Sequence, residues 1–360
     1  MITAEAVIDL AALRTNFDYL AGQQPLSQMV AVIKGNAYGH GSVAVAQALK
    51  GKATCFAVAR LEEARVLRIN GIDAPIMLLE GCFSQEETHE AAAMKLEPVV
   101  QNDQQIEWLS HVDAATPMQL WLKIDTGMHR LGFAPEQIAS RHQLLSSFAC
   151  VVDPVGFVSH LSQADEIDSN QTDYQLAIFK DTTEALGGPR SLANSAALLT
   201  RPDIQFERSR PGIALYGSSP MAGRTGVDEG LIPVMTLRSK LIAVREHQQG
   251  EPVGYGAIWH SKSDTKIGVV AMGYGDGYPR TMPSGTPIWI NGRTVPLVGR
   301  VSMDMLTVDL GAESADKVGD EVVLWGPQNP VEKIAAQVGT IGYELLIQLT
   351  ERVKRTYINY

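Results

Sequence analysis

Between residue 28 and about residue 215, short apolar runs alternate with amphipathic stretches that carry apolar residues at helical spacing. This alternation is typical of repeated βα units, in which buried parallel strands are followed by helices. It predicts a (β/α)8 barrel of the TIM type, whose catalytic side chains lie at the C-terminal ends of the strands. Helices are expected at 61–69, 86–95, 135–148 and 174–186, and the eight strands at 28–34, 55–59, 74–79, 96–100, 119–124, 155–160, 190–194 and 212–217.

The pattern changes after about residue 230, where β-branched residues alternate along short runs that Gly and Pro interrupt. Such runs are typical of short strands joined by turns. A chain of 360 residues also exceeds the length at which a single hydrophobic core usually stops growing. We therefore expect an α/β protein with two domains, a barrel over residues 1–230 and a mainly β domain over residues 231–360.

Charge and composition exclude several classes of function. The formal net charge is −10 and no Lys/Arg cluster is present, so nucleic acid is not expected as a partner. The N-terminal residues lack the pattern of a secretory signal, and no segment has the apolar length needed to cross a bilayer. A cytoplasmic protein without a membrane partner is expected. Cys55, Cys82 and Cys150 are scattered and odd in number, which predicts reduced thiols rather than disulfides or a metal site.

The segment VIKGNAYGHG is the leading candidate for chemistry, because Lys34 ends the first expected barrel strand. Burying an ammonium group is costly unless the group is paired or loses its proton. A neutral lysine at the top of a barrel is suited to Schiff-base chemistry. The alternative is a surface lysine whose aliphatic stem lies along apolar neighbours.

VIKGNAYGHG resembles the cofactor-lysine motif of the bacterial alanine racemases, which are pyridoxal phosphate enzymes built from a barrel and a β domain. Gly35 departs from the family, which more often has alanine there, and adds backbone freedom without removing a functional group. The resemblance implies a homodimer with shared active sites, pyridoxal 5'-phosphate as cofactor and alanine as substrate. It continues in the same order through KIDTGMHRLGF, SHLSQADE, NSAA, RPGIALYG, VGYGAIWH, GYGDGYPR, GRVSMDM and GYELL.

The resemblance implies that Lys34 carries the cofactor as a Schiff base and acts as one of two acid/base groups. Without it, Ser195 would be interpreted as an ordinary helix N-cap and Arg210 as the partner of a carboxylate such as Glu207. The resemblance instead implies a phosphate site formed by Tyr38, Ser195, Tyr343 and the amides of Gly212 and Ile213, with Arg210 at the pyridine nitrogen and His160 beneath the ring, hydrogen-bonded to Arg210 and Tyr255.

The substrate side of the site is also implied by the resemblance. Tyr255 would be the second base, on the opposite face of the cofactor, contributed by the other subunit. Arg130 would contact the substrate carboxylate and the phenolic oxygen of the cofactor, since a guanidinium group suits planar anions. Lys123 matches a position that is carbamylated in some family members. The amide of Met303 would lie near the substrate carboxylate, Asp304 would belong to the same wall, and Tyr274 and Arg280 would line the entrance corridor.

The implied reaction is the interconversion of L-alanine and D-alanine, which would supply D-alanine for peptidoglycan or serve alanine breakdown. Lys34 and Tyr255 would act on opposite faces while the cofactor serves as electron sink. The alternatives are a racemase of broader specificity, a decarboxylase of the same architecture and a non-enzymatic cofactor carrier. Arg210 counts against the decarboxylase, because such enzymes present a carboxylate to the pyridine nitrogen. The domain that bears Tyr255 counts against the carrier.

Overall fold

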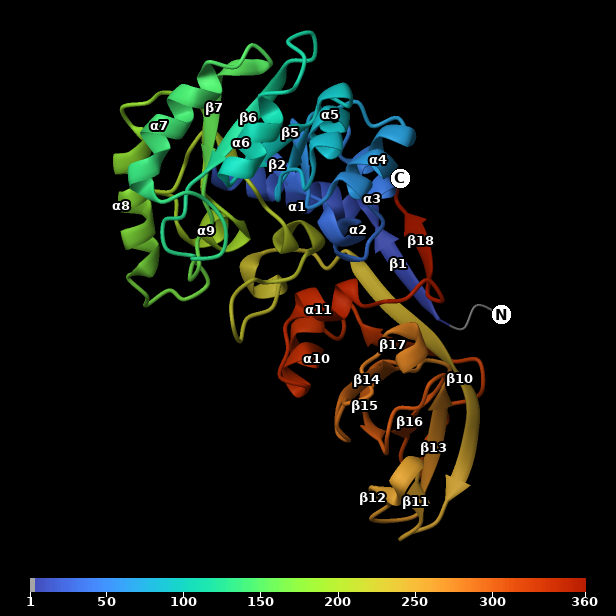
Figure 1. Ribbon diagram of the computed structural model, residues 1–360. Coiled ribbons are helices and arrows are strands. Elements are labelled where there is room, and N and C mark those ends of the chain that lie inside the picture. The colour runs from blue at the N-terminus through green and yellow to red at the C-terminus, as the bar shows by residue number, and fades with distance from the viewer. Residues whose placement is uncertain (1–3) are drawn as a thin grey trace.

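The computed structural model describes residues 4–360, and its first part is a closed barrel of eight parallel strands (Figure 1). The expected fold class, a TIM-type barrel followed by a mainly β domain, is confirmed. Apolar side chains fill these strands because a parallel sheet is covered on both faces. The barrel strands are β2 (Gln28–Val32), β3 (Cys55–Val58), β4 (Ile76–Leu78), β5 (Glu97–Val100), β6 (Met118–Lys123), β7 (Val151–Val158), β8 (Arg190–Ser191) and β9 (Arg208–Ser209).

Helices cover the outside of the barrel (Figure 1), and four of them occupy the stretches in which the sequence predicts helices. Local caps set their first residues: the Ser84 hydroxyl accepts the N–H of Glu87 at 3.2 Å. Among residues 4–360, no helix has the length and apolar character that crossing a membrane requires. The helices of this part are α1 (Leu10–Gln23), α2 (Lys34–Tyr38), α3 (Ser42–Ala48), α4 (Leu61–Ile69), α5 (Gln85–Ala93), α6 (Asp103–Leu109), α7 (Pro135–Ser146), α8 (Gln171–Thr183) and α9 (Ser195–Thr200).

The eighth barrel strand lies earlier in the chain than the sequence pattern predicts. The strand is β9, whereas the 3-10 helix η1 (Ile213–Tyr216) occupies most of the segment 212–217. The Leu215 N–H donates to the Gly212 carbonyl at 3.0 Å. The expectation of a strand at 212–217 was wrong, because a short, fully buried apolar run has the same pattern in a strand and in a helical turn.

The C-terminal part is built on an eight-stranded sheet that also contains the first strand of the chain, β1 (Glu5–Asp9). This strand pairs antiparallel with β10 and parallel with β18, and it is not among the strands expected from the sequence. The hairpin of β11 (Pro252–Val253) and β12 (Trp259–His260) lies at the end of the domain away from the barrel (Figure 1). The other strands are β10 (Met235–His247), β13 (Thr265–Val270), β14 (Pro287–Ile290), β15 (Arg293–Val298), β16 (Leu306–Asp309), β17 (Glu321–Trp325) and β18 (Lys354–Ile358).

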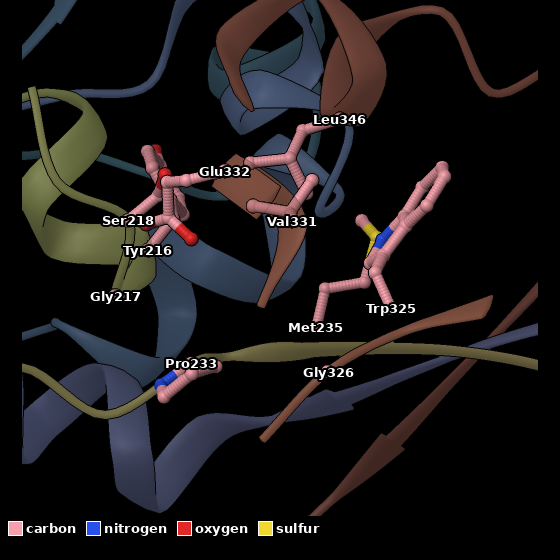
Figure 2. Close-up of a pocket in the computed structure, with 10 residues that line it drawn as sticks. All are labelled: Tyr216, Gly217, Ser218, Pro233, Met235, Trp325, Gly326, Val331, Glu332 and Leu346. Carbon is pink, nitrogen blue, oxygen red and sulfur yellow. The ribbon is translucent and has the colours of Figure 1, made fainter. Parts of the chain in front are cut away.

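A polar contact beside a small cavity joins the barrel to the β domain (Figure 2). Glu332, in α10 (Val331–Gln337), accepts the N–H of Ser219 at 2.8 Å and that of Gly226 at 2.9 Å. One carboxylate therefore ties α10 to two points of the segment that leaves the barrel. The cavity, of about 10 Å³, is lined by Tyr216, Gly217, Ser218, Pro233, Met235, Trp325, Gly326, Val331, Glu332 and Leu346.

A buried ion pair lies inside the barrel near the N-terminal ends of its strands. Glu97 accepts a hydrogen bond from Arg208 Nη1 at 2.5 Å and another from the Trp121 indole N–H at 2.9 Å. The guanidinium of Arg208 lies over the Trp121 ring, 4.7 Å from its centroid. Each of the two charges therefore has a partner, and the pair joins β5 to β9 inside the barrel.

We predict that Glu97→Ala lowers the free energy of unfolding by about 3–5 kcal/mol, because it leaves a buried guanidinium without its partner. Urea unfolding followed by circular dichroism measures the change. Glu90→Ala is the matched control: it removes the partner of Arg65 in a more exposed pair and is expected to cost less than about 1 kcal/mol. Equal losses in the two variants would contradict a special role for the buried pair.

Candidate active site

Lys34 follows β2 at the C-terminal end of the barrel and begins a left-handed turn. Gly35, Asn36, Ala37 and Tyr38 all have φ between 51° and 61°. Residues with a Cβ avoid this region, at a cost of roughly 1–2 kcal/mol each, because the Cβ approaches the following carbonyl oxygen. The turn is therefore strained at three residues, while glycine at position 35 adopts the conformation freely. Interactions outside the turn must hold it.

Lys34 shares this end of the barrel with three other cationic side chains, Lys123, Arg130 and Arg210. Burial lowers the pKa of Lys34 below its ordinary value of 10.5. The charges of Glu80 and Glu63 oppose this shift, whereas those of Arg130 and Arg210 add to it. Burial and the charges of the same two arginines lower the pKa of Lys123 to about 7. Burial lowers the pKa of Arg210 to about 10, so this residue keeps its proton at neutral pH. Lysines near arginines are thus shifted toward the neutral amine.

The carboxylates around this cluster are engaged elsewhere. Within residues 4–360, no ion pair joins Lys34, Lys123, Arg130 or Arg210 to a carboxylate. The cluster therefore carries an excess of positive charge that an anionic ligand can balance. Glu63 accepts the N–H of Gly35 at 2.6 Å, Glu80 pairs with Arg60 at 3.8 Å, and Asp125 pairs with His129 at 3.3 Å.

Arg210 directs its buried guanidinium toward neutral acceptors. Its Nη1 donates to the Ser191 hydroxyl at 2.6 Å and its Nη2 to the Ser159 carbonyl at 2.5 Å. The alternative partner suggested by the sequence, Glu207, instead accepts the backbone N–H of Arg190 at 2.8 Å and pairs with its side chain at 3.4 Å. The charge of Arg210 is therefore not neutralised by a carboxylate of the described chain.

His160 follows β7 and lies beside the cation cluster. Burial, and then the charge of Arg210, lowers its pKa well below 6.5, so the imidazole is neutral at pH 7. The resemblance implies hydrogen bonds from this ring to Arg210 and Tyr255, but none joins these side chains among residues 4–360. One ring nitrogen of the neutral His160 is therefore available as a donor and the other as an acceptor.

Tyr38 and Tyr343 meet next to the start of η1. Their ring centroids are 5.9 Å apart, although Tyr343 comes from α11 (Gly342–Ile347) near the end of the chain. A Cβ on Gly212 would lie 2.5 Å from the Tyr38 hydroxyl oxygen, so glycine is required for this close approach. The hydroxyl and the backbone of η1 thus face each other without an intervening side chain.

Ser195 is brought to the same place from α9. Its hydroxyl oxygen accepts the N–H of Gly212 at 2.8 Å and that of Ala214 at 3.3 Å. The interpretation of Ser195 as a helix N-cap was wrong, because Asn194 caps α9. The N–H of Ile213, as the first in η1, has no acceptor within the helix. Hydroxyl and amide donors from three separate segments therefore converge on one spot.

Apart from Tyr343, the residues expected from the second domain do not join this cluster. Tyr255 is 69% exposed and begins η3 (Tyr255–Ala257), between β11 and β12 at the far end of the β domain (Figure 1). Lys34 and Tyr255 of one chain are therefore far apart. Met303 and Tyr274 are 51% and 39% exposed, Arg280 is exposed, and Asp304 pairs with Arg352 at 2.7 Å.

Gln175 supports the site but is not among the residues expected from the sequence. Its buried Nε2 donates to the Thr126 hydroxyl at 3.1 Å and the His160 carbonyl at 3.0 Å, and its Oε1 accepts the N–H of Ser162 at 2.9 Å. The Thr126 hydroxyl also contacts that of Ser159 at 2.9 Å. The signal in the sequence that could have identified Gln175 is a polar residue on the apolar face of an amphipathic helix. Its amide fixes the loops that follow β6 and β7.

The donors at this end of the barrel fit a phosphate-bearing aldehyde. Hydroxyl groups and amides can hold a phosphate, as the Tyr38 and Ser195 hydroxyls and the Ile213 amide are placed to do, while the Gly212 amide donates to the Ser195 hydroxyl. A lysine whose pKa is lowered, such as Lys34, can condense with an aldehyde. The fold and the site are those of the pyridoxal phosphate-dependent enzymes built from a TIM-type barrel and a β domain.

Comparison with known proteins narrows this class. Residues 8–220 match the family model of the alanine racemase N-terminal domain, and residues 234–357 that of the C-terminal domain. The chain is 51% identical over 356 residues to the alanine racemase of Haemophilus influenzae, covering 99% of each chain. The biosynthetic alanine racemase of Pseudomonas aeruginosa has 44% identity and a TM-score of 0.96 over the whole of both chains.

A third comparison includes the cofactor. The alanine racemase of Bartonella henselae, whose crystal structure contains covalently bound pyridoxal phosphate, is 30% identical with a TM-score of 0.90, over 99% of this chain and 100% of that one. The chain belongs to the alanine racemase family of isomerases, which depend on pyridoxal phosphate.

We predict that Gln175→Leu lowers the free energy of unfolding by about 2–4 kcal/mol, because several buried polar groups lose their partners. Thermal and urea unfolding of the variant measure the loss. Gln171→Leu, in the same helix, serves as control, since the Gln171 amide makes one long hydrogen bond of 3.5 Å to the Gly127 carbonyl. A Gln175→Leu protein as stable as the control would contradict this role.

Proposed function

We propose that the chain interconverts L-alanine and D-alanine, with pyridoxal phosphate bound at the C-terminal end of the barrel. The observation that carries the proposal is the Lys34 amine, shifted toward its neutral form beside uncompensated cations and a cluster of hydroxyl and amide donors. The bound cofactor supplies an electron sink for the charge left when the α-proton of the amino acid departs. Family membership supports alanine as the substrate.

The chain's own residues supply binding and proton transfer. Lys34 would hold the cofactor covalently until the amino group of the substrate replaces it, and the released Lys34 amine would then take or return the α-proton on one face. The Tyr255 hydroxyl does so on the opposite face, and the two exchange roles with the direction of the reaction. Arg130 binds the substrate carboxylate with its planar guanidinium, and the Met303 N–H assists it.

The cofactor-binding residues divide between the phosphate and the ring. Arg210 has a pKa of about 10, so at neutral pH it stays protonated and does not protonate the ring nitrogen. This favours racemisation over decarboxylation, in which the negative charge of a carboxylate would keep the ring nitrogen protonated. Tyr38, Ser195, Tyr343 and the amides of Gly212 and Ile213 would hold the phosphate, Arg210 would bind the ring nitrogen, and His160 would support the ring.

Two chains are needed to complete each active site. Within one chain Tyr255 lies at the end of the β domain remote from the barrel (Figure 1), so it acts on the Lys34 of a second subunit. Its exposure, together with that of Met303, supports an interface there. We propose that the barrel of residues 1–230 binds the cofactor and that residues 231–360 supply the second base and the dimer contacts.

The width of the entrance distinguishes an alanine racemase from one of broader range. Tyr274 is half-exposed in η4 (Tyr274–Asp276), and Arg280 follows it on the same loop. Asp304 pairs with Arg352 at 2.7 Å. The carbonyl of the preceding residue, Met303, accepts the N–H of Gly275 at 2.8 Å, which places Asp304 beside the loop of Tyr274. These groups narrow the corridor and favour a methyl side chain.

Lys123 is proposed to carry a carbamate. Its amine has a pKa of about 7 and lies among cations, so it is available to attack carbon dioxide. The ammonium first loses a proton to solvent. The neutral nitrogen then forms a bond to the carbon of CO₂, one C=O bond opens to place a negative charge on its oxygen, and the nitrogen releases a second proton, so that a cation becomes an anion. The new carboxylate then pairs with Arg130 and orients it, which removes the like-charge repulsion at this position.

To test the shared site, we predict that Lys34→Ala and Tyr255→Phe are each inactive in forming D-alanine from L-alanine, measured by a D-amino acid oxidase assay. Mixing the two with subunit exchange should restore about one quarter of wild-type activity. Half of the dimers are then hybrids, and each hybrid has one site with both bases intact.

Demonstrated subunit exchange without recovered activity would contradict the shared site, while a wild-type protein that binds pyridoxal phosphate and forms no D-alanine would contradict the proposed reaction. A panel of other L-amino acids in the same assay tests the broader-specificity alternative.

We further predict a carbamate carbon signal in ¹³C NMR when the protein is equilibrated with ¹³C-bicarbonate at pH 8. At this pH a group with a pKa of about 7 is mostly neutral. Since the lowered pKa leaves the neutral amine present above pH 7 and removes it below, the signal should fade as the pH drops toward 6. Lys123→Met should lack the signal, and its persistence in that variant would assign the carbamate elsewhere.

A further inference from the structure

His40 lies in the motif that contains Lys34 and is fully buried, yet neither the phosphate site nor the proton transfer uses it. Its Nδ1 lies 2.9 Å from the Tyr38 carbonyl oxygen and 3.0 Å from that of Ala37. Both neighbours are acceptors, so Nδ1 carries the hydrogen and donates it. Nε2 is buried and has no hydrogen-bond partner among residues 4–360. The ring is therefore neutral, with one fixed tautomer.

The Nδ1–H supports the strained part of the turn. Ala37 and Tyr38 have φ of 55° and 51°, and their carbonyls are the two that His40 binds. No other donor to the Tyr38 carbonyl is present among residues 4–360. A buried carbonyl without a donor is unfavourable, so removing Nδ1–H would release this part of the turn.

The ring of His40 also connects the turn to the strand before it. It stacks on Tyr216 with centroids 4.5 Å apart and an angle of 27° between the planes. The Tyr216 hydroxyl donates at 2.9 Å to the carbonyl of Val32, the last residue of β2 and two residues before Lys34, and the Tyr216 ring lies 5.0 Å from that of Tyr38. His40 thus bridges the two sides of the Lys34 segment.

We propose that His40 is a positioning residue, whose Nδ1–H holds the left-handed turn in the conformation that directs the Lys34 amine and the Tyr38 hydroxyl toward the cofactor. The inference rests on the proposed function, because it assigns these two groups to pyridoxal phosphate. Burial lowers the pKa of His40 to about 4, in agreement with a neutral ring, and the role requires no titration.

Two amide substitutions test whether the donor at the Nδ1 position, and not another property of the histidine, is what the turn requires. In His40→Asn the side-chain amide can place its nitrogen where Nδ1 stands, whereas in His40→Gln the nitrogen reaches the position of Nε2, which has no acceptor. We expect His40→Asn to bind pyridoxal phosphate within about threefold of wild type and His40→Gln at least about tenfold more weakly, the loss expected for one unpaired buried carbonyl.

The experiment measures the dissociation constant of pyridoxal phosphate from each apoprotein by the visible absorbance of the bound cofactor, with thermal unfolding of the apoproteins in parallel. His142→Gln is the matched control. Among residues 4–360, His142 also has a buried Nε2 without a hydrogen-bond partner, but it lies on α7, away from Lys34, and stacks on Phe157 of the barrel. It should leave the affinity unchanged. If His40→Gln does not fold, the comparison is made in the Ala37→Gly background, where the turn needs less support.

The outcomes are distinct. Weaker binding in His40→Gln than in His40→Asn, at similar apoprotein melting temperatures, supports the proposal. Equal affinity in the two variants, whether both are retained or both are lost, overturns it. Absence of cofactor binding by the wild-type protein would instead contradict the proposed function.

Discussion

The excess of positive charge around the buried Arg210 at the C-terminal end of the barrel is the constraint on which the site depends. Lys34, Lys123, Arg130 and Arg210 meet there, and the surrounding carboxylates bind other groups. Like charges in a desolvated space favour the neutral form of whichever group can lose its proton, and lysine loses it more readily than arginine. The same arrangement yields two reactive amines and a site that attracts anions.

Rigid surroundings keep this unfavourable arrangement in place. The turn after Lys34 has three strained residues, held by His40 and by contacts from α11, and Gln175 ties together the loops after β6 and β7. Strain of this kind persists at functional sites where neighbouring structure determines the conformation. At the opposite end of the barrel, Glu97 compensates the charge of Arg208, so that end contributes stability and not reactivity.

Much of the fold could be predicted from the sequence, because buried parallel strands and their helices leave a regular apolar pattern, whereas the role of Lys34 is implied mainly by the resemblance of its motif. The exceptions have physical reasons. The segment 212–217 was taken for a strand because a buried run looks alike in either conformation, and β1 was missed because its partners lie more than two hundred residues away. The role of Gln175 depends on groups that only the folded barrel brings together.

The pKa of the Lys34 amine in the apoprotein tests the central claim most directly. It can be measured from the pH dependence of reductive methylation at Lys34, followed by mass spectrometry of the labelled peptide. The account predicts a value clearly below 10.5 that rises in Arg130→Met, since the arginine charge lowers it. A value at or above 10.5, unchanged by that substitution, would contradict the account.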